Sequence, residues 1–215
     1  MNQDAIWSQR YRDAGDDYLF GTAPNRFMAH RADLFLPGQS VLSVADGEGR
    51  NSVWLAEQGL AVTAIEISAV AVDKARRLAR TRQVEVDFQV ADMFAPDWPP
   101  STLCERFDWV VAIFIQFVGP AQRTRQFELL KRLVRPGGRL LLQGYTPRQI
   151  EYRTGGPSAI ENLYTAELLQ AFFSDWILEE LVEYEDDIAE GLGHKGRSAL
   201  IGLVARKPDP LPEPP

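Results

Sequence analysis

The sequence has a single cysteine, Cys104, and only two histidines, His30 and His194, among its 215 residues. A lone cysteine excludes an intrachain disulfide and a thiolate metal cluster. Zinc and iron sites are built mainly from these two residue types, which are nearly absent here. We therefore expect neither a disulfide nor a metal site.

Long apolar runs and an excess of positive charge are also missing. No stretch approaches the roughly 18 apolar residues that cross a bilayer, and Met1 to Arg12 is polar with mixed charge, unlike a signal peptide. The formal net charge of −7 disfavours binding to nucleic acid or to an anionic membrane, because both need a basic surface. The basic cluster from Lys74 to Arg82 is interpreted as a solvated helix face. We expect a cytoplasmic protein without nucleic-acid or membrane partners.

Short apolar runs alternate with helical patterns along most of the chain. Two helices come first, one around Ile6 and Tyr11 and one from Pro24 to about Phe35. The apolar runs predict strands at residues 40–45, 61–65, 85–90, 108–114, 139–145, 176–184 and 198–205. Further helices are predicted at residues 50–58, 69–82, 121–134 and 165–173.

This order of elements predicts an α/β fold with a doubly wound, mostly parallel sheet of seven strands. Five strands joined by crossover helices are followed by two strands with no helix between them, which predicts a C-terminal antiparallel hairpin over a long loop. Residues 85–90 alternate between polar and apolar, as at a sheet edge, whereas 108–114 is continuously apolar, as in a central strand. Phe114 and Phe117 are expected in the core. Residues 1–207 form one domain, and the proline-rich segment 208–215 is expected to be a disordered tail.

The loop after the first strand has the composition of a ligand-binding turn. In Ala45-Asp46-Gly47-Glu48-Gly49, the two glycines allow a tight bend and a close approach of backbone to ligand. A helix follows at once, so its free N–H groups face the crevice in which open α/β sheets bind ligands. Glu66 ends the next strand, where a carboxylate accepts hydrogen bonds from both hydroxyls of a ribose. These features predict a ligand that contains a nucleoside.

Three observations favour S-adenosylmethionine over NAD as that ligand. Ser52 stands where a dinucleotide fingerprint has its third glycine. Ala91-Asp92-Met93 follows the third strand, where a carboxylate accepts from the adenine amino group and a methionine packs on the ring. The terminal hairpin also departs from a simple dinucleotide-binding repeat. An NAD-dependent oxidoreductase remains the alternative.

Four segments resemble class I methyltransferases, in the variant found in tellurite-resistance and thiopurine-methyltransferase-like proteins. Residues 41–52 resemble motif I, 62–68 the acidic motif of the second strand, 135–139 the turn before the fifth strand, and 20–25 the segment ahead of motif I. The resemblance covers about Trp7 to Lys207. It implies the Rossmann-like methyltransferase fold, S-adenosylmethionine as cofactor, and an N-terminal helical lid over about residues 1–36.

The resemblance also assigns roles at the cofactor site. It implies that Glu66 holds the ribose, that Ile67 lines the adenine, and that Asp92 binds the adenine amino group. The complete implied set is Phe20, Gly21, Ala45, Asp46, Gly47, Glu48, Gly49, Asn51, Glu66, Ile67, Ala91, Asp92, Met93, Ala112 and Ile113.

Motif I departs from the family pattern at two positions. Family members often have an acidic residue at the position of Ser43 and glycine at the position of Ala45. The acid helps to hold the amino group of the methionine part, and a serine offers only a hydroxyl there. We expect Glu48 or Asp46, the neighbouring acids, to compensate for it in this sequence.

The acceptor is the part of the reaction that the sequence leaves open. By analogy with the family we expect a small molecule, such as a thiol or a chalcogen oxyanion, because a soft nucleophile needs little help from a base. Weak candidates for a catalytic residue are Gln116, Tyr145, Glu151 with its neighbour Tyr152, and His194. A non-catalytic module that binds S-adenosylmethionine is a second alternative.

Overall fold

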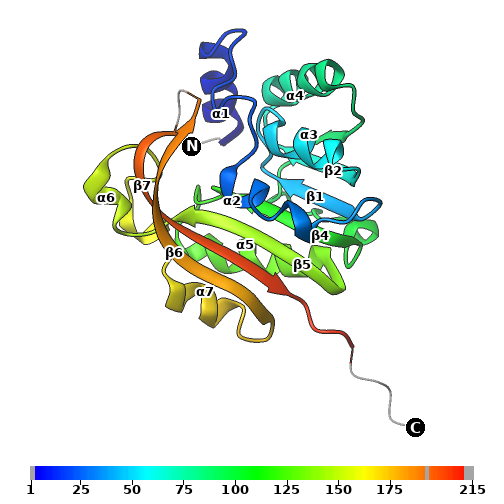
Figure 1. Cartoon of the computed structure of the whole chain (residues 1–215), viewed down its shortest axis with the longest axis vertical. Helices are drawn as coiled ribbons and strands as arrows, with labels where there is room; N and C mark the ends of the chain where they lie inside the picture. The colour runs from blue at the N-terminus through cyan, green and yellow to red at the C-terminus, as the bar shows by residue number, and fades with distance from the viewer. Residues whose placement is uncertain (1–2, 192–193, 211–215) are drawn as a thin grey trace.

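The computed structural model describes residues 3–191 and 194–210, apart from the side chain of His194. Figure 1 shows one twisted sheet with helices packed around it. The α-helices are α1 (Gln3–Asp13), α2 (Arg26–Ala29), α3 (Arg50–Glu57), α4 (Ala69–Arg82), α5 (Pro120–Leu133), α6 (Gln149–Tyr152) and α7 (Ala166–Phe172). The 3₁₀ turns are η1 (Ala32–Leu34), η2 (Ser101–Leu103) and η3 (Ile160–Asn162). The strands are β1 (Ser40–Val44), β2 (Ala61–Glu66), β3 (Asp87–Val90), β4 (Phe107–Ile113), β5 (Val134–Tyr145), β6 (Ile177–Glu190) and β7 (His194–Arg206).

The strands form a sheet in the order β3-β2-β1-β4-β5-β7-β6. Strands β1 to β5 pair in parallel, and β7 is antiparallel to both of its neighbours, β5 and β6. This confirms the predicted doubly wound sheet with its C-terminal hairpin. The edge position of β3 and the central position of β4 are also confirmed. The strand order reverses between β1 and β4, so the loops that follow them diverge and open a crevice at the carboxyl ends.

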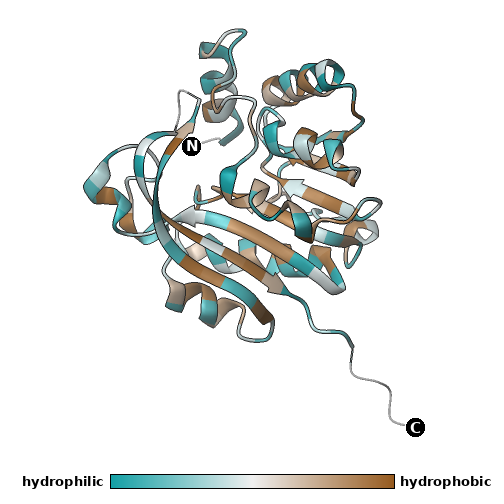
Figure 2. Cartoon of the chain, viewed as in Figure 1, coloured by the Kyte–Doolittle hydropathy of each residue, from teal (hydrophilic) through white to brown (hydrophobic). Residues whose placement is uncertain are grey.

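Both faces of the sheet are covered by helices. Helices α5 and α7 pack on one face, and Phe127 and Leu169 are completely buried there. Helices α2, α3 and α4 pack on the other face, where Phe27 and Leu55 contact the central strands. Figure 2 shows the central strands as largely hydrophobic and α1 as largely hydrophilic. Helix α4 begins where the side chain of Ser68 caps it by accepting a hydrogen bond from the backbone N–H of Ala71.

Two predicted elements differ in the structure. The helix expected from Pro24 to Phe35 is only the short α2 and η1, because the chain bends after Ala29 and returns Phe35 to the sheet, with its ring 4.7 Å from that of Trp109.

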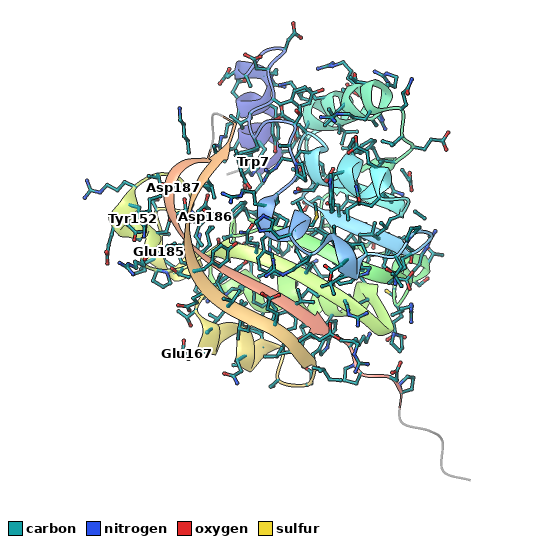
Figure 3. The ribbon with its side chains drawn as sticks, in the orientation of Figure 1. Trp7, Tyr152, Glu167, Glu185, Asp186 and Asp187 are labelled. Carbon is teal, nitrogen blue, oxygen red and sulfur yellow. The ribbon has the colours of Figure 1, made fainter. Side chains whose placement is uncertain are left out.

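The prediction of a long loop in the hairpin is also wrong, because β6 and β7 stay paired out to Glu190 and His194. The charged run Glu185, Asp186 and Asp187 lies on the edge strand β6. Charged side chains there remain in solvent or pair with arginines (Figure 3).

No helix in residues 3–191 or 194–210 has the length and apolar character needed to cross a membrane.

Candidate functional site

A cavity of about 380 Å³ lies at the carboxyl ends of β1, β2, β3 and β4. This volume is within the range of about 300–1,000 Å³ that small-molecule sites occupy. Four strand-end loops and the N-terminal segment form its wall. The lining residues are Gln3, Trp7, Tyr11, Phe20, Ala45, Asp46, Gly47, Arg50, Asn51, Ile65, Glu66, Ile67, Ala91, Asp92, Met93, Phe94, Ile113, Phe114, Phe117, Val118 and Gln122.

The loop after β1 bends through three left-handed residues. Ala45, Gly47 and Gly49 have φ values of 49°, 64° and 90°. A Cβ on Gly47 would lie 3.0 Å from the hydroxyl oxygen of Tyr11, so glycine at this position lets the backbone and Tyr11 approach closely. Helix α3 begins at Arg50 directly after this bend, and Arg50 and Asn51 of its first turn line the cavity.

Ala45 is strained, because a non-glycine residue with φ near 50° costs about 1–2 kcal/mol. We expect Ala45→Gly to raise the free energy of unfolding by about 0.5–1 kcal/mol after the entropy of the more flexible unfolded chain is subtracted. Urea denaturation measures this change. Ala64→Gly is the matched control, because Ala64 is buried in β2 with φ in the usual range, and there the same substitution should destabilise the protein. A loss of stability in Ala45→Gly would contradict the strain argument.

Asp46 lies in the cavity wall and is buried. Its carboxylate accepts hydrogen bonds from the hydroxyls of Ser43, at 2.6 Å, and Ser52. Burial raises the pKa of Asp46 above its usual value, against the effect of these two serines. The two acids proposed to compensate for Ser43 thus differ, because Asp46 lines the cavity and Glu48 does not.

Glu66 lies at the end of β2 and is also buried in the cavity wall. Its carboxylate accepts from the backbone N–H groups of Gly47, at 3.0 Å, and Ser68, at 2.9 Å. Burial raises the pKa of Glu66 to about 7, against these two hydrogen bonds. The same carboxylate therefore fixes the β1 loop and faces the cavity.

The loop after β3 supplies the opposite side of the cavity. Asp92 lines it and accepts a hydrogen bond from the backbone of Phe94 at 2.8 Å. Ile67 and Met93 provide apolar surface beside it. The predicted grouping of Glu66 and Asp92 around a cavity at Gly47 is present in the structure.

Four residues of the predicted cofactor set do not line the cavity. Glu48 forms a buried ion pair with Lys74 at 2.8 Å and accepts from the backbone of Leu19. Gly49 packs on α4, where a Cβ would lie 2.7 Å from that of Ala75. Gly21 packs against the end of β6, and Ala112 is buried within the sheet. Glu48, Gly49 and Gly21 therefore position the loops around the site.

The N-terminal segment contributes lining residues that the sequence pattern did not indicate. Gln3, Trp7 and Tyr11 come from α1, and Figure 3 labels Trp7 on this helix. Helix α1 is attached to the start of α4, where the hydroxyls of Ser8 and Ser68 are 2.7 Å apart. The aromatic residues at positions i and i+4 of α1 were the available signal, but nothing in the sequence indicated which element they face.

Other lining residues were missed or interpreted differently. Phe114 and Phe117 were expected in the core, and both line the cavity. Arg50 lies within the motif I segment but had no predicted role. Additional lining side chains outside the predicted set are Ile65, Phe94, Val118 and Gln122.

None of the described candidates for a catalytic residue lines the cavity. The side chain of Gln116 is buried and bonds to the backbone of Tyr145 on both its nitrogen and its oxygen. Tyr145 stacks on the cavity residue Phe114 with ring centroids 4.6 Å apart. Glu151 is exposed on α6 beside Tyr152. The side chain of His194 lies outside the described part of the structure.

Comparison with known proteins decides the class of this site. Residues 41–138, which contain the loops after β1 to β4, match the model of a family described as a methyltransferase domain. Residues 41–138 are therefore assigned to a methyltransferase domain, and the sheet around them has the Rossmann-like methyltransferase fold. The match and the fold imply S-adenosylmethionine as the methyl donor, and the NAD alternative is not favoured. No curated protein matches the chain by sequence.

Solved structures share the fold of this methyltransferase domain. The structure described as "Conversion of a Disulfide Bond into a Thioacetal Group during Echinomycin Biosynthesis" is 20% identical with a TM-score of 0.77, over 96% of this chain and 93% of that one. TehB from Haemophilus influenzae is 17% identical with a TM-score of 0.67, and the match covers 95% of this chain and 66% of that one. The magnesium protoporphyrin IX methyltransferase of Synechocystis PCC 6803, with bound SAH, is 16% identical with a TM-score of 0.62. The match covers 96% of this chain and 88% of that one. At these identities the likeness establishes the fold.

Proposed function

We propose that this methyltransferase domain methylates a small-molecule thiol or chalcogen oxyanion. The observation that carries the proposal is the composition of the cavity wall. Among the described residues that line it, there is no histidine, lysine or cysteine, and each carboxylate lies in a loop assigned to the donor. A soft nucleophile needs no protein base, whereas an oxygen or nitrogen acceptor usually does.

The residues around the β1 to β3 loops fit the donor. Glu66 would accept from the ribose hydroxyls, Asp92 would accept from the adenine amino group, and Asp46 would face the ammonium group of the methionine part. Ile67 and Met93 would enclose the adenine ring. When bound, S-adenosylmethionine supplies a methyl group on a sulfonium whose positive charge disperses during transfer. The protein then has to orient the two reactants and exclude water.

The remaining wall of the cavity is aromatic and would hold the acceptor. Phe114, Phe117 and Val118 follow β4, and Phe94 follows β3. Phe94 and Phe117 pack edge to face with centroids 6.4 Å apart. Such a wall favours an acceptor with an apolar body beside its reacting atom.

The polar groups near this wall are poor proton acceptors. Gln3 and Gln122 are neutral amides. Tyr11 has a pKa well above its usual value because it is buried, and the nearby carboxylates raise the pKa further. Its hydroxyl therefore stays protonated at neutral pH. The acceptor has to arrive as a nucleophile or ionise by itself, as a thiol does.

The charge of the wall favours a thiol over an oxyanion. The cavity wall has three carboxylates, those of Asp46, Glu66 and Asp92, and one cation among its described residues, Arg50. Even with a cationic donor bound, this wall gives little attraction for an acceptor of two negative charges. The protein's net charge of −7 likewise supports a small-molecule acceptor over a nucleic acid or membrane.

We also propose that the segment before β1 acts as the lid of the site. Trp7, Tyr11 and Phe20 lie over the cavity, and Trp7 contacts both aromatic partners, with centroids 6.0 Å from Tyr11 and 6.4 Å from Phe20. Arg10 stacks on Trp7 at 4.4 Å. This cover would exclude water from the reacting atoms.

Measurement of S-adenosylhomocysteine formation across an acceptor panel tests the proposal. The panel contains aryl and alkyl thiols, selenite, tellurite, halides, phenols and small amines. We expect turnover with thiols, fastest at pH 7 for thiols whose own pKa is near 7, because nucleophilicity and ionised fraction then balance. The pH at half-maximal kcat/KM should change with the thiol. Turnover confined to tellurite or selenite would select the oxyanion instead.

Turnover with amines or phenols alone would overturn the proposal, as would the absence of turnover with every acceptor in the panel. If the pH at half-maximal kcat/KM is the same for every thiol, a protein base acts in the reaction. His194→Gln would then be expected to remove this pH dependence.

A further inference from the structure

We propose that Glu190, at the end of β6, positions Arg50 to bind the carboxylate of the methyl donor. The donor's amino-acid end carries one negative and one positive group, and a buried carboxylate needs a cation or several hydrogen-bond donors. Arg50 is the one cation among the described residues of the cavity wall. It directly follows the loop that carries Asp46, so opposite charges lie four residues apart in the cavity wall.

Arg50 and Glu190 form an ion pair that is almost completely buried. The guanidinium and carboxylate are 2.7 Å apart, and their side chains are 8% and 6% exposed. Arg50 also donates to the backbone oxygen of Ala23 at 3.4 Å. These contacts use two of the five N–H donors of an arginine. The others are available for a ligand in the cavity that Arg50 lines.

Glu190 is itself held in place by a second set of contacts. Its other carboxylate oxygen accepts from the side-chain amide of Asn25 at 3.0 Å. The same amide donates to Gln143 in β5, and the backbone N–H of Asn25 donates to Asn51 beside Arg50. The carboxylate of Glu190 is therefore fixed from α2, α3 and β5 together, which limits the directions in which Arg50 can point.

The backbone next to Glu190 is fixed by close packing. Gly191 lies against Leu19, Phe20 and Gly21, and a Cβ there would collide with their backbone atoms. Both Gly21 and Gly191 have positive φ values, 70° and 62°. The end of the hairpin thus packs directly on the segment whose Phe20 covers the cavity. Glu190 has a defined place relative to the site even though 140 residues separate it from Arg50.

A structural role alone would not explain where this pair lies. Buried ion pairs often add little stability over apolar residues of similar size. The domain has a second buried pair, Lys74 and Glu48, with both side chains 3% exposed, and neither of its residues lines the cavity. Comparing variants of the two pairs therefore separates an effect of the pair at the cavity from the general effect of breaking a buried ion pair.

Calorimetry with two ligands tests the proposal without requiring turnover or a known acceptor. S-adenosylhomocysteine has the amino-acid end, and 5′-methylthioadenosine has the same nucleoside and sulfur but lacks that end. We expect Glu190→Gln and Arg50→Lys to weaken S-adenosylhomocysteine binding about 10- to 100-fold, because a charge-assisted hydrogen bond is lost or misdirected. Binding of 5′-methylthioadenosine should change less than about threefold.

Glu48→Gln is the control, because it breaks the other buried pair by the same chemical change. We expect it to leave the ratio of the two dissociation constants unchanged, whatever it does to stability. The proposal is overturned if Glu190→Gln weakens both ligands equally or weakens neither. Thermal shifts with each ligand give the same comparison if a variant is too unstable for calorimetry at 25 °C.

Discussion

Replacement of Glu66 by glutamine is expected to weaken S-adenosylmethionine binding about 10- to 100-fold. In the proposed site the carboxylate would accept from the donor's ribose hydroxyls while it holds the N–H groups of Gly47 and Ser68. Glutamine has one acceptor oxygen in place of two, so one of these charge-assisted hydrogen bonds is lost. Titration calorimetry with S-adenosylhomocysteine at pH 8 measures the change. An affinity within a factor of about two of the wild type would remove Glu66 from the donor site.

The pH dependence provides an internal control for this prediction. Burial raises the pKa of Glu66 from 4.5 to about 7 in the protein without donor, so donor affinity should fall as pH drops below 7, and this fall should be absent in Glu66→Gln. Between pH 4.5 and about 7 the native state binds more protons here than the unfolded state does. The free energy of unfolding should therefore decrease as pH rises across this window, by up to about 3 kcal/mol, and Glu66→Gln should reduce the slope.

Substitution of Gly49 by alanine is expected to destabilise the fold by about 3 kcal/mol, the largest change in stability that we predict. Gly49 has a φ of 90°, which costs an alanine about 1–2 kcal/mol. The new Cβ would also lie 2.7 Å from the Cβ and 2.9 Å from the Cα of Ala75 in α4. Since both are rigid parts of the packed helix, α3 and α4 must move apart. Urea denaturation of the purified variant measures the loss.

Gly15→Ala separates the two contributions to this loss. Gly15 has a φ of 59°, but a Cβ added there would have no atom within 4 Å. This variant should lose only the backbone contribution, about 1 kcal/mol. Equal losses at Gly15 and Gly49 would show that the contact between α3 and α4 relaxes without cost, contrary to what the distances indicate.

The side of the cavity formed by the loops after β1, β2 and β3 was largely predictable, because it follows from the strand pattern. Parallel strands place their carboxyl ends at one edge of the sheet. The apolar runs that end at Ala45, Ile65 and Val90 are therefore sufficient to place the loops with Asp46, Glu66 and Asp92 side by side. All three acids line the cavity.

The direction of individual side chains was not predictable in the same way. Glu48 lies between two glycines of the β1 loop, and its direction depends on the three positive φ values of that loop. It turns toward Lys74, which is 26 residues away in the chain. The aromatic cover from α1 and the contact of Glu190 with Arg50 depend on tertiary packing between distant segments, for which the local pattern gives no signal.

The position of β7 inside the sheet affects the order in which a newly synthesised chain can fold. Strand β6 pairs with β7, which lies between it and β5. While translation proceeds, β6 has no neighbouring strand to pair with until β7 has left the ribosome. The guanidinium of Arg50 therefore lacks its counter-charge until β6 and β7 have been made, although the loops after β1 to β4 precede them in the chain. The wall of the site around Arg50 can therefore be completed only after the C-terminal hairpin has formed.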